Sequence, residues 1–275
     1  MFSKIIKNVK TKTPLVHNIT NYVTVNDCAN ILLACGGSPI MADDIAEVEE
    51  ITSICNALVI NIGTLNSRTV ESMIKAGKKA NELNIPVILD PVGIGASKLR
   101  TDTAFRLLEE IRFTVVRGNM SEIKAVGKAG TSETRGVDAS VDDIITEENI
   151  DETVKYINSL AERLVSVVAV TGAIDIVADG TKAYVIRNGH PFMSKISGTG
   201  CMLSSIIGAF CGANKDNFID ATAAAVCVMG LCGELAYEKM KKNDEGTSSL
   251  KCHLIDSIGK INNGMLKEGA KIEIR

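Results

Sequence analysis

The stretch "ALVINIGTLNSRTVESMIKAGKKANELNIPVILDPVG" (residues 57–93) determines the expected fold. It begins with an apolar run (57–63), continues with a helical pattern (67–84) and ends with a second apolar run (85–93). Strands that are apolar throughout, rather than at every second position, are covered on both faces, as in parallel sheets. A helix of this length between two such strands predicts a βαβ unit.

The same alternation continues toward the C-terminus. After Gly172 the pattern changes, and two β-like runs around Asp179 and Gly180 predict a hairpin. We therefore expect an α/β fold, with a central mostly parallel sheet flanked by helices, in a single domain over residues 1–275. The further predicted elements are strands at 113–119 and 166–172, helices at about 101–111, 121–129 and 141–163, and three closing helices that begin near Cys201, Asn217 and Ser249.

Composition excludes several classes of function. The net charge of −3 gives no electrostatic footprint for nucleic acid or an anionic membrane, and the chain has no tryptophan to stack on bases. The eight cysteines contain no C-x-x-C pair, which argues against zinc and thioredoxin-type chemistry. The N-terminus lacks the apolar stretch of a signal peptide, and the apolar run at 221–233 is too short to span a bilayer. A cytoplasmic protein is expected.

Polar residues and glycines follow each predicted strand, and ligands of parallel sheets bind at that edge. Arg117 could clamp phosphate oxygens, or it could form a surface salt bridge. Asp90 and Glu122 could hold Mg²⁺ together with substrate phosphates. Alternatively, Asn119 caps the following helix and Glu122 completes a capping box.

The turn Gly198-Thr199-Gly200 leads directly into a helix that begins near Cys201. Glycines allow backbone N–H groups to converge on a ligand, and the helix N-terminus adds a positive dipole, so the turn predicts an anion site. The same helix N-terminus is expected to lower the pKa of the Cys201 thiol below its usual value of about 8.5. The alternative is a glycine-rich connection followed by a buried structural cysteine.

Several motifs together resemble the ribokinase-like superfamily and, within it, the hydroxyethylthiazole kinase family of thiamine salvage. The resemblance runs over nearly the whole chain, and "HNITN" and "GTGC" are its specific parts. It implies a ribokinase-like three-layer fold and a homotrimer with active sites near the subunit interfaces. The motifs are "PLVHNITNYVTVNDCAN" (14–30), "GGSPIMADD" (36–44), "LVINIGTL" (58–65), "VILDPVGIGA" (87–96), "VVRGNMSEI" (115–123), "RGVDA" (135–139), "AVTGAIDIVADG" (169–180) and "SGTGC" (197–201).

The resemblance implies an activity and a set of site residues. The activity is transfer of the ATP γ-phosphoryl group to the primary hydroxyl of 4-methyl-5-(2-hydroxyethyl)thiazole, in thiamine (vitamin B1) biosynthesis or salvage. The implied contacts are Arg117 and Thr171 for ATP, Met41, Gly198 and Asn21 for the thiazole alcohol, and Asp90 and Glu122 for Mg²⁺. Without the resemblance, Met41 could equally be a residue of the hydrophobic core.

Cys201 stands where most ribokinase-like enzymes have an aspartate base. Two related enzymes, hydroxymethylpyrimidine kinase and NAD(P)H-hydrate dehydratase, usually carry that aspartate and lack "HNITN". A non-catalytic thiazole or nucleotide sensor is the alternative from another class. The phosphate clamp expected from Asp90, Arg117 and Glu122 argues against a sensor, because a binder of a neutral alcohol needs no such clamp.

Overall fold

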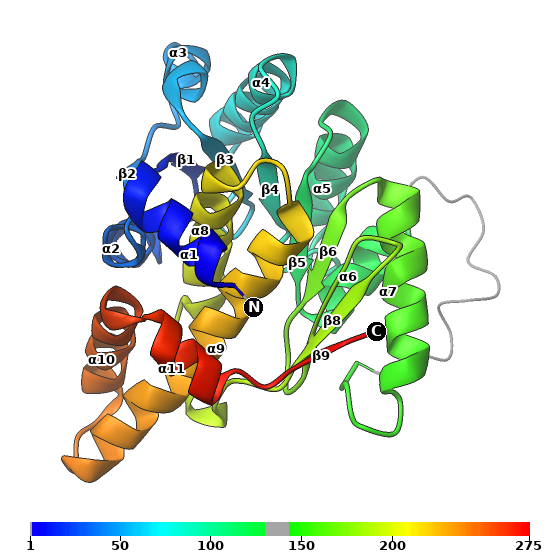
Figure 1. Ribbon diagram of the computed structural model, residues 1–275. Coiled ribbons are helices and arrows are strands. Elements are labelled where there is room, and N and C mark those ends of the chain that lie inside the picture. The colour runs from blue at the N-terminus through cyan, green and yellow to red at the C-terminus, as the bar shows by residue number, and fades with distance from the viewer. Residues whose placement is uncertain (1, 130–142) are drawn as a thin grey trace.

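Nine strands form a mixed sheet in the part of the chain that the structure, a computed structural model, describes, residues 2–129 and 143–275 (Figure 1). The strand order is β2-β1-β3-β4-β5-β6-β7-β8-β9. Neighbours from β2 to β6 are parallel, whereas β7, β8 and β9 add on antiparallel. The strands are β1 (Leu15–Ile19), β2 (Ser38–Ile40), β3 (Ala57–Asn61), β4 (Val87–Asp90), β5 (Val115–Gly118), β6 (Val167–Val170), β7 (Asp175–Ala178), β8 (Ala183–Ile186) and β9 (Ile272–Ile274).

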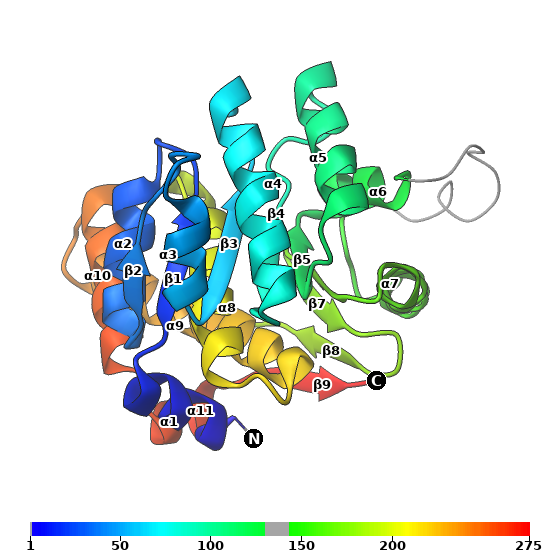
Figure 2. The ribbon, with the colours of Figure 1, turned by 90° about the horizontal axis from the view of Figure 1, so that it is seen from above.

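Helices cover both faces of this sheet, which gives three layers (Figure 2). Helices α4 to α7 lie on one face, and α8 and α9 lie on the other (Figure 2). The helices are α1 (Ser3–Lys12), α2 (Val25–Cys35), α3 (Val48–Ile54), α4 (Ser67–Glu82), α5 (Lys98–Glu110), α6 (Met120–Gly127), α7 (Ile150–Leu164), α8 (Thr199–Ala213), α9 (Phe218–Lys242), α10 (Thr247–Lys260) and α11 (Asn263–Gly269).

Strand β3 illustrates why the central strands are apolar at successive positions. Ala57 and Val59 are buried in the cluster that includes α8 and α9. Leu58 and Ile60 point to the opposite face and are buried in the cluster that includes α4 and α5. Successive side chains of a strand alternate between faces, so a sheet covered twice needs apolar residues at every position.

The predicted strands in the middle of the sheet and the hairpin after Gly172 are confirmed. The outer parallel strands β1 and β2 and the C-terminal edge strand β9 were not delineated from the sequence. Helix α7 begins at Ile150 rather than near 141; positions 141–142 and the "RGVDA" motif (135–139) lie outside the described residues.

Helix α9 is the one helix among the described residues that is long and apolar enough to cross a membrane. The apolar run at 221–233 was judged too short for this, but the helix that contains it has 25 residues. The most apolar 18-residue window of α9 is 78% buried inside the fold. Its apolar character is therefore accounted for by packing between the sheet and helices α8 and α10.

Candidate active site

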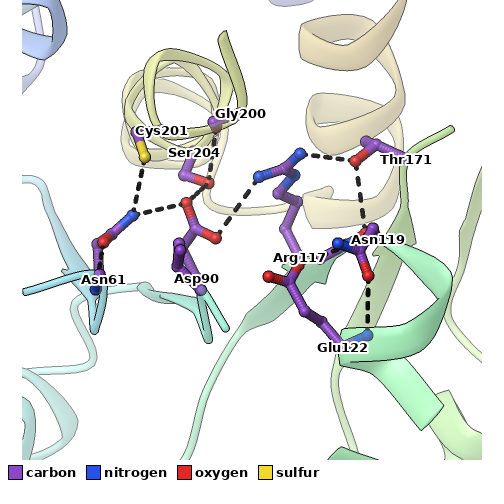
Figure 3. Close-up of polar contacts among 12 residues, drawn as sticks. Asn61, Asp90, Arg117, Asn119, Glu122, Thr171, Gly200, Cys201 and Ser204 are labelled. Carbon is purple, nitrogen blue, oxygen red and sulfur yellow. Dashed lines mark hydrogen bonds and ion pairs between the residues drawn. The ribbon is translucent and has the colours of Figure 1, made fainter. Parts of the chain in front are cut away.

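Four neighbouring parallel strands deliver polar side chains to one edge of the sheet, facing the start of α8 (Figure 3). Asn61 ends β3 and is paired in register with Asp90, which ends β4. Arg117 is the penultimate residue of β5, and Thr171 directly follows β6. The carboxyl edge predicted to hold the site therefore does bring these residues together.

Asp90 is fully buried at the centre of this group. Its Oδ2 accepts hydrogen bonds from Asn61 Nδ2 at 2.8 Å and from Ser204 Oγ at 2.8 Å. Its Oδ1 lies 3.5 Å from Arg117 Nη1. Burial raises the pKa of Asp90, while the Arg117 charge acts in the opposite direction.

Arg117 is not the surface salt bridge that the sequence offered as one of its two roles, because its guanidinium is buried beside Asp90. Its Nη2 donates to Thr171 Oγ1 at 2.6 Å, and its side chain is largely buried. Its Nε is buried and has no hydrogen-bond partner among the described residues. A buried donor without a partner is unusual in a native fold, and a ligand oxygen would satisfy it.

The two glycines of the turn are needed for different reasons. Gly198, the N-cap of α8, has φ +88°, and a Cβ there would lie 2.6 Å from Thr24 Cγ2. Gly200 is already helical, but a Cβ there would lie 2.6 Å from Arg117 Nη1. The first glycine permits the turn, and the second permits the guanidinium to lie against the start of the helix.

Cys201 lies in the first turn of α8, on the side away from Arg117 (Figure 3). Its Sγ accepts from Asn21 Nδ2 at 3.2 Å and from Asn61 Nδ2 at 3.3 Å. The expected lowering of its pKa is wrong: burial, and then the nearby Asp90 charge, raise the pKa of the thiol. Desolvation outweighs the helix dipole here, so the sulfur is a neutral thiol at pH 7.

Glu122 forms the capping box that the sequence offered as one of its two roles. Asn119 Oδ1 accepts from Glu122 N, and Glu122 Oε2 accepts from Asn119 N, each at 2.9 Å. Glu122 Oε1 accepts from Gly93 N at 2.8 Å, in the loop after β4. Each oxygen of this carboxylate keeps a second lone pair, so capping does not prevent it from binding a cation or its water shell.

A cavity of about 690 Å³ opens beside Arg117 and the start of α8. Its polar wall includes Arg117, Thr171, Thr199 and Gly200. Its lining also includes apolar residues of α8 and α9, such as Leu203, Val226 and Met229. A cavity of this size that combines an anion clamp with an apolar wall suits a nucleotide.

Comparison with known proteins now identifies the family. The family model described as the hydroxyethylthiazole kinase family matches residues 6–264. The chain belongs to the hydroxyethylthiazole kinase family. A hydroxyethylthiazole kinase of Clostridium acetobutylicum is 57% identical over 273 residues, which cover 99% of both chains. A solved hydroxyethylthiazole kinase structure from Pyrococcus horikoshii OT3 is 37% identical with a TM-score of 0.88, and the match covers 100% of this chain and 98% of that one.

A more distant structure supports the fold alone. A ribokinase-like superfamily protein of Enterococcus faecalis is 13% identical with a TM-score of 0.60, over 93% of this chain and 88% of that one. The predicted hydroxyethylthiazole kinase family, the ribokinase-like fold and the assignment as a kinase are confirmed.

The remaining predicted residues of this family member lie at the same edge of the sheet. Asn21 lies in the segment after β1. Its Nδ2 donates to Cys201 Sγ, and its Oδ1 accepts a hydrogen bond from Thr24 Oγ1 at 3.0 Å. Met41 directly follows β2, so it lies two strands away from β3 and is partly buried. Gly198 lies against Thr24 at the start of α8.

Sequence reasoning missed three polar residues of the site. Asn61 has no role that the sequence alone reveals, because its importance comes from its place in register with Asp90. Ser204 is one helical turn after Gly200 and therefore faces the same side of α8. Asp175 lines the cavity and accepts from Gly172 N at 2.9 Å.

Proposed function

We propose that this chain transfers the γ-phosphoryl group of ATP to the primary hydroxyl of 4-methyl-5-(2-hydroxyethyl)thiazole, in thiamine biosynthesis or salvage. Family membership supports the substrate. The observation that carries the mechanism is the start of α8, where Gly200 lies against the Arg117 guanidinium and the next residue, Cys201, faces the amides of Asn21 and Asn61. The transferred group would pass between these two sides.

The residues of the cavity would bind and neutralise the triphosphate. Arg117 directs donors toward the start of α8, and Thr171 holds the guanidinium in place. The N-terminal N–H groups of α8 add positive potential where charge moves during transfer. Preorganised charge of this kind is the main protein contribution to phosphoryl transfer, because its transition state is loose.

The thiazole alcohol would bind on the Cys201 side, with Asn21, Gly198 and Met41 forming its pocket. A neutral thiol is a weak general base, but a loose transition state requires little removal of the hydroxyl proton at an early stage. Cys201 would therefore mainly orient the hydroxyl, and correct orientation can itself supply much of the rate.

Magnesium would be held by Asp90 and Glu122, directly or through water. The donors fit: Mg²⁺ takes one or two carboxylates and leaves its other positions to phosphates and water. The described residues contain no group of three or more His, Cys, Asp or Glu that could hold a metal ion. The ion would supply neutralisation of the phosphate charge.

We also propose a cytoplasmic homotrimer built from single-domain chains. The continuous sheet, with strands from Leu15 to Ile274, supports one domain. Tyr22 is 79% exposed and Val23 is 61% exposed, directly beside Asn21. Apolar side chains exposed next to a substrate pocket support a subunit interface at that place.

The test is a Mg·ATP transfer assay that compares hydroxyethylthiazole with hydroxymethylpyrimidine and detects the phosphorylated product by mass. A strong preference for the thiazole alcohol is expected. Transfer to the pyrimidine alone would assign the chain to the related kinase reaction instead. Binding of ATP and the thiazole without any transfer would contradict the proposal and favour a sensor.

A further inference from the structure

Asn61 is a buried amide whose hydrogen-bonding capacity is fully used. It is 2% exposed at the end of β3. Its Oδ1 accepts from Asn21 Nδ2 at 3.0 Å and from Gly63 N at 2.9 Å. Its Nδ2 donates to Asp90 Oδ2 at 2.8 Å and to Cys201 Sγ at 3.3 Å. These four contacts match the two lone pairs and two protons of an asparagine side chain.

The backbone fixes which way this amide points. Gly63 N can only donate, so the atom that faces it must be the Asn61 oxygen. The amide nitrogen is then directed toward Asp90 and Cys201 (Figure 3). Rotation of the amide by half a turn would place its nitrogen against the Gly63 and Asn21 donors and its oxygen against the Asp90 carboxylate.

This orientation links two groups that do not touch. Asn61 donates to Asp90 on the side of the Arg117 clamp and to Cys201 on the side of the thiazole pocket. It also holds Asn21, whose amide is the second donor to the Cys201 sulfur. Loss of Asn61 would therefore remove one donor to the sulfur and release the other.

We propose that Asn61 is a positioning residue of the phosphoryl-transfer site, which fixes the Cys201 sulfur for the acceptor hydroxyl and directs Asp90 toward Arg117. This role rests on the proposed function for its effect on turnover, but its effect on Cys201 does not. Asn61 acts through its two neighbours, Asp90 and Cys201.

The test variant is Asn61→Asp, which keeps the side-chain size and replaces the donor by an acceptor next to Asp90. The rate of Cys201 alkylation by iodoacetamide, followed by peptide mass spectrometry at a series of pH values, measures the reactivity of the sulfur directly. Exposed Cys252 serves as the reference within the same protein.

We expect the midpoint of Cys201 alkylation to move to higher pH and kcat to fall by about tenfold or more. The KM for ATP should change by less than about threefold, because the Arg117–Thr171 contact remains.

The second variant, Asn61→Ser, covers the case in which Asn61→Asp does not fold. It removes the linkage without adding charge, and it should lower kcat with the same small change in KM. The control is Asn30→Ala, an exposed asparagine on α2 that bonds to Asn26, for which no change is expected.

Unchanged Cys201 alkylation in Asn61→Asp, or full turnover in Asn61→Ser, would overturn the positioning role. An inactive wild-type protein would refute the proposed function instead, and the alkylation profile would still decide on Asn61.

Discussion

Replacement of Gly200 by alanine tests whether the start of α8 is shaped for the Arg117 clamp. Gly200 has helical backbone angles, so alanine causes no backbone strain and even gains about 1 kcal/mol of helix propensity. Its Cβ, however, would lie 2.6 Å from Arg117 Nη1 and 2.9 Å from Nη2. Relief to the 3.4 Å of ordinary van der Waals contact requires a displacement of about 0.8 Å.

That displacement should reduce activity while stability is retained. The Arg117 guanidinium is buried, and its Nη2 donates a hydrogen bond to Thr171 Oγ1 at 2.6 Å. It therefore cannot move aside without a change in the direction of its N–H donors. A misplacement of about 1 Å can lower the rate by about a hundredfold. We expect kcat/KM for ATP to fall by roughly 10- to 100-fold, or about 1.4–2.7 kcal/mol of transition-state stabilisation. The melting temperature should change little.

A double-mutant cycle with Arg117→Ala identifies the cause. If the methyl group acts through the guanidinium, Gly200→Ala should have little further effect once Arg117 is alanine. Initial rates at varied ATP concentration, together with thermal melting of all four proteins, give the coupling. Equal losses in both backgrounds, or an unaffected Gly200→Ala protein, would refute the reasoning about this contact.

Three further predictions concern ionisable groups of the site. Cys201→Asp should keep or raise turnover, because the Asn21 and Asn61 donors can hold a carboxylate; complete loss of activity in a folded protein would contradict this. Glu122→Ala should lose about 1 kcal/mol of stability with its capping box and most of its activity, and full activity would remove the magnesium assignment. Burial raises the pKa of Asp175 from 3.8 to about 7, so the folded protein holds a proton that the unfolded chain releases between these values. Its contribution to stability is therefore lost as pH rises toward about 7, and thermal melts of Asp175→Asn should be flatter with pH than those of the wild type.

The sequence predicted the parts of the fold in which a strand is buried on both faces of the sheet. Strands β3 to β6 are apolar on both sides, and this pattern is visible without coordinates. Strand β9 carries charge at Glu273 because it is an edge strand, and β2 has only three residues, so neither has a distinctive pattern. His17 is buried in β1, where its two ring nitrogens contact Thr52 Oγ1 and Ala42 O, and nothing in the apolar pattern of the sequence specifies those partners.

The candidate site was predictable in its position but not in its electrostatics. Strand ends place Asp90 and Arg117 at one edge in any parallel sheet, so the sequence suffices. The pKa of the Cys201 thiol depends on how much water reaches the sulfur and on the Asp90 charge behind it. Both depend on tertiary packing, which explains why the helix-dipole argument alone gave the wrong direction.

Neighbouring positions 200 and 201 are expected to respond in opposite ways to added atoms. Position 200 faces a buried guanidinium, so even a methyl group there would displace the charge that is proposed to neutralise phosphate. Position 201 faces two amide donors that hold a neutral sulfur and can equally hold an anionic oxygen. Because phosphoryl transfer depends more on charge placed around the phosphate than on removal of the hydroxyl proton, a methyl group at 200 should do more harm than a change of chemistry at 201. Under the proposed mechanism, changes at 201 are therefore tolerated as long as the glycine before it is retained.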